Sequence, residues 1–424
     1  MNSFSSWIGH SFNTPEEILV EFKNRLAGIE PAEVKPAISF LPDSVSISDV
    51  PVDGSDWAGL PLAGVPFLVK DLYDVAGWPT TASSPFLADE YGIPATTSPL
   101  VRKFMELGAT PIGKTHLNEF AYGLSGRNLH YGNCRHPLHH DRLPGGSSSG
   151  SAWAVGKGIV PLALGTDTGG SVRVPAAFCG LFGIRLIPNE WSQNGCFPLS
   201  PTFDTAGWFT ADREDMAVTL KLMLDLADSK DTPRYTPRGV LLKVEDLPCD
   251  PELKGEYVRL CDEFNLQSDP YIQESFQAVV TDLTLSYSVL QSLESYAVHE
   301  KWLDQFQEQY SPAVWQRIDR GRHWSSEEIA ASEKGRGELR YFFGQLFNSF
   351  DYAVLPATMI PAPREDQLDE AFRSQIITLT APASLAALPV LTVPVHIGNQ
   401  LSGGLQIIYA NPESDLPLMF LDSN

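Results

Sequence analysis

Cysteine is scarce in this chain of 424 residues, and no two cysteines form a CxxC pair. An odd number of thiols cannot be paired completely within one chain, which excludes a disulfide-stapled scaffold and a CxxC metal or redox motif. Reduced thiols and a cytoplasmic location are therefore expected. The five cysteines are Cys134, Cys179, Cys196, Cys249 and Cys261.

Positive charge and long apolar runs are also lacking. Lysine and arginine number 30 against 52 aspartate and glutamate residues, a formal net charge of −22. This sign of charge excludes unaided binding to nucleic acid or to an anionic membrane. No apolar run reaches the roughly 18 residues that span a bilayer, and the start MNSFSSWIGHSFNTPEE lacks the basic and apolar segments of a secretory signal. We expect a soluble protein that acts on a small molecule, and a homodimer is compatible with this composition.

Glycine and proline are spread along the chain and mark no linker. Length alone predicts two or three domains. Because no linker separates the chain into parts, one large α/β domain is also possible. Short apolar strands alternate with amphipathic helices, a pattern typical of a mixed sheet sandwiched between helices. Thr-Pro-Glu-Glu at 14–17 predicts the start of a helix, and 98–107 has the apolar spacing of another.

The most informative stretch is 145–185, GGSSSGSAWAVGKGIVPLALGTDTGGSVRVPAAFCGLFGIR. It places two glycine–serine clusters around an apolar run at 158–164. Serine hydroxyls flanked by glycine are exposed, and the backbone N–H groups beside them can point at one spot. That combination suits a nucleophile beside donors for a developing oxyanion. Either cluster alone is more typical of an ordinary loop.

Three other patterns fit known sites but lack the required context. Residues 108–115, GATPIGKT, have the spacing of a phosphate-binding loop, yet a helix is predicted before them and Pro111 lies where amides must face phosphate. Residues 146–150, GSSSG, fit the nucleophile elbow and would make Ser148 the nucleophile, but the polar RHPLHHDRLPG precedes them instead of an apolar strand. The histidines and aspartate of 136–141 lack metal-ligand spacing, and a solvated loop is expected.

Taken together, GGSSSGSA and GTDTGGSVRVPAAFCG resemble the signature of the amidase signature family nearly residue for residue. GVPFLVKDLYDVAG at 64–77 resembles the family's strand that ends in a lysine, and the specific resemblance covers about 59–209 and 378–409. It implies one α/β domain over residues 1–424, with a mixed, mostly parallel, twisted sheet between α-helices. The implied parts are a signature core at about 59–209, a variable substrate-pocket region at about 239–350, and closing strands and helix at about 351–424.

The resemblance also implies a catalytic set. Ser171 matches the family's nucleophile, Ser147 matches the bridging serine that follows a cis peptide, and Lys70 matches the base. To accept a proton, this lysine must be neutral, so burial must lower its pKa. No metal or organic cofactor is implied. The backbone N–H groups that match the oxyanion hole are those of Thr168, Gly169 and Gly170.

Further residues are expected around this set. Asp167 and Arg173 are expected to brace the nucleophile loop, and Ser148 to be a hydrogen-bonding neighbour within it. The segment YGLSGRNLHYG at 122–132 resembles the part of indole-acetamide and related aryl-amide hydrolases that borders the acyl pocket. Its candidate substrate-binding residues are Tyr122, Gly123 and Ser125, although a loop that simply covers the core fits them equally well.

Two positions bear on the substrate. Val174 stands where malonamate-hydrolysing members carry an arginine, and Ile377 or Thr378 stands where the A-type chains of glutamyl-tRNA amidotransferases carry an aspartate for the α-amino group. We therefore expect an amidase that cleaves a small uncharged primary amide, such as an aryl-acetamide, to carboxylate and ammonia through a seryl acyl-enzyme. The alternative is a glutamine-dependent amidotransferase chain of the A type that supplies ammonia to a partner. A degenerate binding protein is disfavoured, because all three catalytic residues are present.

Overall fold

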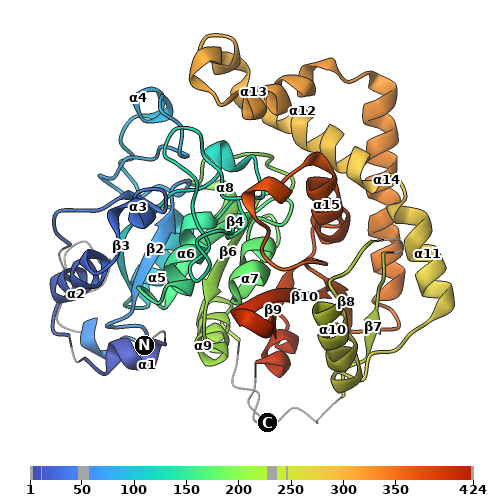
Figure 1. Cartoon of the computed structure of the whole chain (residues 1–424), viewed down its shortest axis with the longest axis horizontal. Helices are drawn as coiled ribbons and strands as arrows, with labels where there is room; N and C mark the ends of the chain where they lie inside the picture. Colours follow the sequence, from blue (N-terminus) through green and yellow to red (C-terminus); the bar gives the residue numbers. More distant parts are fainter. Residues whose placement is uncertain (1–2, 11, 46–56, 227–235, 245–246, 422–424) are drawn as a thin grey trace.

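A single twisted sheet runs through the computed structural model, which describes residues 3–10, 12–45, 57–226, 236–244 and 247–421 (Figure 1). Ten strands within these residues form the sheet, in the order β1-β3-β2-β4-β6-β5-β9-β10-β8-β7. The strands are β1 (Ile38–Phe40), β2 (Pro66–Lys70), β3 (Thr110–Thr115), β4 (Leu162–Asp167), β5 (Phe182–Arg185), β6 (Thr205–Thr210), β7 (Gly239–Leu241), β8 (Tyr352–Pro356), β9 (Val390–Ile397) and β10 (Leu401–Tyr409).

Helices surround the sheet, and α12 packs against α13, α14 and α15 at the top and right of Figure 1. The helices are α1 (Phe4–Ile8), α2 (Pro15–Ala27), α3 (Pro31–Val34), α4 (Leu87–Tyr91), α5 (Pro99–Glu106), α6 (Ser149–Gly156), α7 (Arg173–Cys179), α8 (Glu190–Gln193), α9 (Arg213–Met223), α10 (Pro251–Glu263), α11 (Pro270–Val280), α12 (Leu283–Leu303), α13 (Pro312–Asp319), α14 (Ser326–Leu346) and α15 (Glu370–Leu385).

Parallel and antiparallel pairs are mixed in this sheet, and the predicted α/β architecture with helices on both sides is confirmed. The pairs β2–β3, β2–β4 and β7–β8 are parallel, whereas six further pairs of described strands are antiparallel. Parallel pairing is therefore less extensive than we expected. The connections explain the difference: residues 398–400 alone join β9 to β10 and force them antiparallel, while the crossover through α4 and α5 returns β3 parallel to β2.

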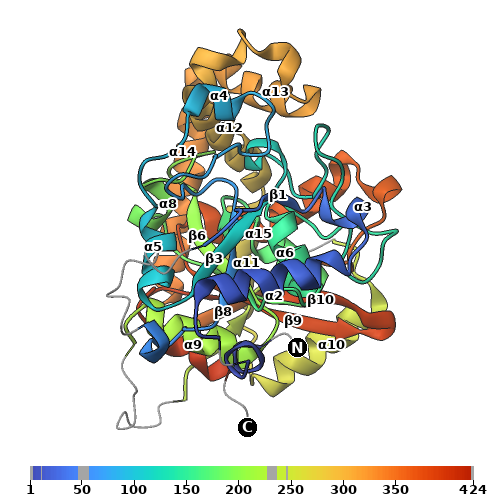
Figure 2. The ribbon, with the colours of Figure 1, turned by 90° about the vertical axis from the view of Figure 1, so that its left-hand side faces the viewer.

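Side-chain alternation along β2 directs Lys70 toward the serine clusters. All five residues of this strand are buried, so both of its faces are covered. Phe67 packs on one face against Phe104 of α5, with ring centroids 5.6 Å apart. Lys70, three residues later, points to the opposite face. Figure 2 shows α5 and α9 on one side of the sheet and α2 and α6 on the other.

The predicted helix starts are confirmed, and residues 108–115 lack the strand-then-helix setting of a phosphate-binding loop. Thr14 Oγ1 accepts a hydrogen bond from Glu17 N at the start of α2, and α5 falls within the expected 98–107. Gly108, with φ +98°, follows that helix, and the chain continues into β3 instead of a second helix. Lys114 on β3 is buried against Asp71 at 3.2 Å, so its ammonium does not face an open loop.

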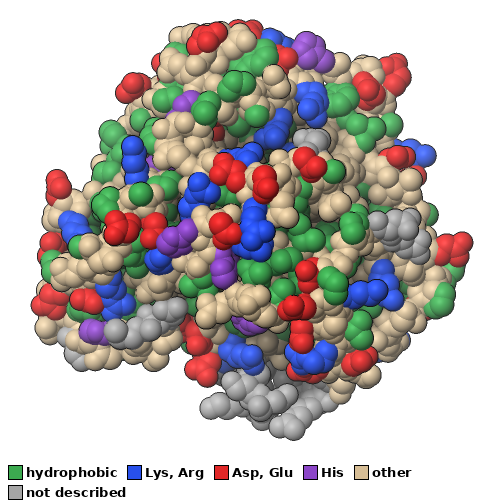
Figure 3. Space-filling model, in the orientation of Figure 1, with side chains coloured by type: hydrophobic (Ala, Val, Ile, Leu, Met, Phe, Trp, Pro, Cys, Tyr) green, Lys and Arg blue, Asp and Glu red, His purple; other side chains and the backbone are tan. Residues whose placement is uncertain are grey.

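Several features outside the site concern the cysteines, the membrane and metals. The five cysteines are free thiols, and loop structure instead of a strand precedes the 146–150 elbow pattern. None of the described helices combines the length and apolar composition needed to cross a bilayer. Within the described ranges, no three His, Cys, Asp or Glu side chains converge as a metal site would require. Acidic and basic side chains are intermixed over the face in Figure 3.

Candidate active site

Lys70 lies at the end of β2, and its ammonium is buried among hydroxyl groups. Its Nζ lies 2.7 Å from Ser147 Oγ, 2.9 Å from Ser148 Oγ and 2.7 Å from Thr166 Oγ1. Burial lowers the pKa of Lys70 to about 7, and the more distant negative charge of Asp167 only partly offsets this effect. A lysine in this state supplies a neutral amine at neutral pH, which can accept a proton from a hydroxyl group.

The first serine cluster precedes α6 and reaches Lys70 with two hydroxyls. The Gly146–Ser147 peptide bond is cis, as the family resemblance implied. Ser148 Oγ also donates a hydrogen bond to Thr166 O, at 3.2 Å. The sequence pointed to Ser147 as the partner of the lysine, but the structure brings Ser148 to almost the same distance.

Ser171 lies in the loop between β4 and α7, beside the first cluster. Its carbonyl oxygen accepts a hydrogen bond from Ser148 N at 3.3 Å, which ties the two serine clusters together. Within the described part of the chain, no hydrogen bond joins the side chains of Ser147 and Ser171. Ser171 lines a small cavity that also contacts α12 and α15.

The loop before Ser171 presents backbone donors, but not all three that the sequence indicated. Gly170 N–H donates to Asp167 Oδ1 at 2.8 Å and is therefore engaged. Among the described residues, the N–H groups of Thr168 and Gly169 have no acceptor. Only glycine fits at 169, since a Cβ there would lie 2.0 Å from Tyr287 Oη. The candidate oxyanion donors are therefore reduced to Thr168 and Gly169.

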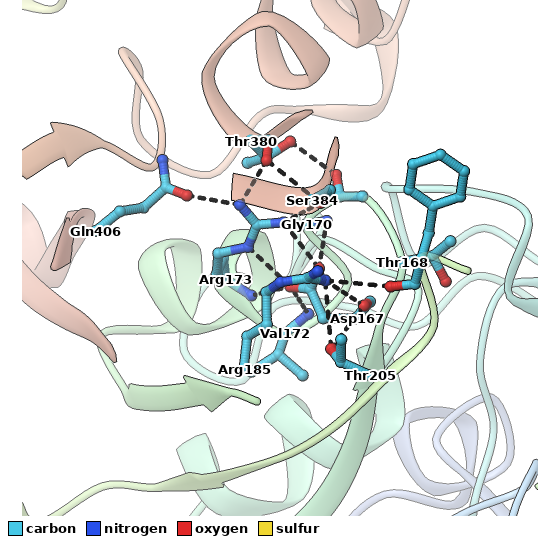
Figure 4. A network of polar contacts seen from close by, with 12 residues as sticks. Asp167, Thr168, Gly170, Val172, Arg173, Arg185, Thr205, Thr380, Ser384 and Gln406 are labelled. Atoms are coloured by element: carbon cyan, nitrogen blue, oxygen red, sulfur yellow. Dashed lines mark hydrogen bonds and ion pairs between the residues drawn. The ribbon is translucent and has the colours of Figure 1, made fainter. Parts of the chain in front are cut away.

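Asp167 is the centre of a buried ionic network that shapes this loop (Figure 4). Its carboxylate accepts from Gly170 N, Val172 N and Arg173 N at 2.8 to 3.2 Å, and it pairs with Arg173 Nη2 at 2.8 Å and Arg185 Nη1 at 3.1 Å. Burial alone would raise the pKa of Asp167, but the two guanidinium groups and the hydrogen bonds hold it below its usual range.

Arg173 extends the network to the closing helix and strand. Its Nη1 donates to Thr380 O at 2.6 Å and to Gln406 Oε1 at 2.7 Å, and its Nη2 donates to Ser384 Oγ at 2.8 Å. Figure 4 shows these groups surrounding the guanidinium. Arg173 is fully buried, its side chain bonds to the loop and to the closing helix and strand, and it does not line the small cavity.

A cleft of about 720 Å³ lies outside the small cavity. Tyr122, Gly123 and Arg373 line both spaces, which therefore adjoin. Ser125 lines only the outer cleft, where its Oγ accepts from Arg127 N at 3.2 Å. Of the three predicted substrate-binding residues, two line both spaces and one lines only the outer cleft.

Sequence reasoning missed four residues of the site. Arg185 ends the apolar strand FGIR, and a charge in that position was a usable signal for a buried pair. Thr166 lies inside the signature stretch GTDTGG, but nothing in that stretch indicates that its hydroxyl contacts Lys70. Tyr287 and Gln291 lie on α12, in a part of the chain without signature residues, and only the tertiary structure brings them to the cavity.

A family model described as Amidase matches residues 52–302, more than half of the chain. This chain belongs to the amidase family. The amidase is 29% identical to "Amidase 1" of Arabidopsis thaliana over 85% of its own length and 92% of the relative's. It is 30% identical to the A-type chain of the glutamyl-tRNA(Gln) amidotransferase of Akkermansia muciniphila, over 84% and 85% of the two chains.

The fold is similar to that of known amidases as well. A solved structure described as "Crystal structure of amidase" superposes with a TM-score of 0.80 at 26% identity, covering 98% of this chain and 96% of that one. Family, relatives and structure agree that this amidase is a hydrolase of the C–N bonds of amides.

Proposed function

We propose that this amidase hydrolyses a small, uncharged primary amide of the aryl-acetamide type to a carboxylate and ammonia, through an acyl-enzyme on Ser171. The buried contact between Lys70 Nζ and Ser147 Oγ, at 2.7 Å, carries the proposal. Burial that lowers the pKa of this lysine to about 7 gives the site a base at the pH where amide hydrolysis must proceed.

Each step is a proton or acyl transfer among these groups. Ser147 passes its proton to neutral Lys70 and takes the proton of Ser171, whose Oγ attacks the amide carbon. The N–H groups of Thr168 and Gly169 stabilise the oxyanion. The proton returns through Ser147 to the nitrogen as the C–N bond breaks and ammonia leaves. Water then attacks the acyl-enzyme by the same relay and releases the carboxylate.

Three observations support an uncharged acyl group. Arg173 is held by Asp167 and the closing helix, so it does not supply a counter-ion for a substrate carboxylate. Val174, at the position of the malonamate arginine, is buried in an apolar cluster. Ile377, one of the two residues that stand where A-type amidotransferase chains carry an aspartate, lines the small cavity, and an apolar side chain there suits an acyl group without an α-amino group.

The second candidate is a glutamine-dependent amidotransferase chain of the A type that delivers ammonia to a partner. The amidotransferase relative and the position of Arg373 favour it, because this cation lines both the cleft and the cavity and could face the carboxylate of glutamine.

Purified protein alone distinguishes the two candidates. Ammonia release is measured with phenylacetamide, indole-3-acetamide, benzamide, isobutyramide and glutamine, with Ser171→Ala as the blank for contaminating activity. Turnover of the aryl-acetamides above glutamine supports the first candidate. Release from glutamine alone supports the second, and so does inertness that an added amidotransferase partner relieves.

A further inference from the structure

Gln291 is a buried polar side chain beside Ser171 with an unused hydrogen-bond acceptor. The residue lies on α12 and is 4% exposed. Its Oε1 is buried and has no hydrogen-bond partner among the described residues. Gln291 and Ser171 line the same small cavity. Buried carboxamide oxygens are nearly always satisfied by protein, by ordered water or by a ligand, and a substrate that reaches Ser171 must enter the cavity that Gln291 also lines.

The partner belongs to the substrate, and the position of the proton relay indicates which part of it. The leaving nitrogen must be reprotonated through Ser147, so it must lie on the side of Lys70. Neither of these residues lines the cavity that Gln291 faces. The wall around Gln291 comes instead from α12 and α15. Gln291 therefore lies on the acyl side of the scissile bond, away from the leaving amine.

We infer that Gln291 accepts a hydrogen bond from an N–H or O–H group on the acyl part of the substrate, and so selects acyl groups that carry such a donor. The inference rests on the proposed amidase function. Leu124 and Ile377 make part of the remaining wall apolar, and its other polar side chains are two tyrosines and Arg373, so Gln291 supplies its one carboxamide acceptor. A buried acceptor left unpaired disfavours the analogue that lacks the donor.

Tyr287, one turn before Gln291 on α12, connects this acceptor to the reacting centre. A Cβ on Gly169 would lie 2.0 Å from Tyr287 Oη, so this tyrosine packs directly on the oxyanion loop. The same face of α12 thus meets the candidate oxyanion loop and brings Gln291 to the wall of the cavity. A donor bound by Gln291 fixes the acyl group relative to Ser171 and affects reactivity as well as binding.

The test compares hydroxyphenylacetamides with methylphenylacetamides at the ortho, meta and para positions, because a methyl group has nearly the size of a hydroxyl but donates no hydrogen bond. For each position, kcat/KM of the hydroxyl compound is divided by that of the methyl compound. Gln291→Met removes the acceptor and keeps the chain length. We expect the preference for the hydroxyl compound at the favoured position to fall on the order of ten- to a hundredfold, with little change for the methyl compounds.

Gln277→Met is the matched control. Gln277 on α11 also has a buried Oε1 without a described partner, but it does not line the cavity, so its substitution leaves the preference unchanged. Gln291→Leu repeats the measurement should the methionine variant lose its cooperative thermal transition.

The outcomes separate the two proposals. Ammonia release with the same hydroxyl preference in wild type and both Gln291 variants overturns the inference and leaves the proposed function intact. An equal loss on every amide places Gln291 on the scissile amide and also overturns the acyl assignment. No ammonia from any amide with the wild-type protein refutes the proposed function, and the inference with it.

Discussion

Lys70 Nζ lies 2.7 Å from Ser147 Oγ, and the Lys70 residue is fully buried. Burial lowers the pKa of this lysine to about 7, and only its neutral form accepts a proton. We therefore expect kcat/KM to rise with pH through about 7 and to level off above it. Lys70→Ala should remove this limb and lower activity by orders of magnitude. A pH–rate profile with one amide measures both effects.

Lys114→Met provides the control for a buried lysine outside the relay. Lys114 Nζ contacts Asp71 and Pro79 O, at 3.2 and 2.7 Å, and touches neither serine cluster. This variant should keep the inflection near pH 7 even where it lowers stability. A pH–rate profile of Lys70→Ala with the same inflection as the wild type would exclude the lysine as the base.

Alanine variants of Ser171, Ser147 and Ser148 should differ in covalent labelling as well as in turnover. Ser171→Ala should abolish covalent labelling by a fluorophosphonate and leave only background activity. Ser147→Ala should cut turnover by orders of magnitude but retain slow labelling, because the nucleophile remains while its proton has lost its path. Ser148→Ala should have the smallest effect, since Lys70 keeps Ser147 and Thr166 as partners. Mass spectrometry of the labelled peptide decides: an adduct on Ser148 would contradict the assignment.

Much of this site could be predicted from the sequence because its parts lie in short, regular segments. Lys70 ends a strand that the apolar run in the sequence predicts, and Ser171 follows another such strand. The start of α2 was equally predictable, since Thr14 caps the helix through its own local hydrogen bond. Local chemistry determines such features, so a single sequence contains the information.

The rest depends on contacts between distant residues. Gln291 reaches the cavity only because α12 packs beside the nucleophile loop, more than a hundred residues away in the sequence. The hydrogen bond from Gly170 N–H to Asp167, which leaves Thr168 and Gly169 as the candidate oxyanion donors, cannot be predicted from residue spacing. Strand direction likewise depended on which connections are short, as between β9 and β10.

Removing Arg173 should destabilise the protein severely. Arg173→Leu leaves the buried Asp167 carboxylate with one guanidinium fewer and several acceptors without a donor. Breaking one partner out of a buried pair costs on the order of 3–5 kcal/mol. The urea midpoint should fall accordingly.

Arg259→Leu serves as the comparison for Arg173→Leu, because Arg259 pairs with Glu263 at 2.7 Å in an exposed position. Such surface pairs contribute little to stability, so the urea midpoint should barely move. Similar losses in the two variants would show that the Asp167 network does not support the fold.

His299 should make the protein sensitive to acid. It is fully buried, its Nδ1 lies 2.9 Å from Tyr310 Oη, and its ring packs edge-on against Phe120. Burial lowers the pKa of His299 to about 3, against about 6.5 in the unfolded chain. Between these values the unfolded chain binds a proton that the folded chain does not, so the free energy of unfolding falls as the pH drops below 6.5, by at most about 1.4 kcal/mol per pH unit. His299→Gln, which cannot titrate, should lose stability at pH 7 but lose less than the wild type on going from pH 7.0 to pH 5.5. Urea unfolding of both proteins at the two pH values measures the difference, and equal losses on acidification would show that His299 stays uncharged in the unfolded chain or becomes charged in the folded one.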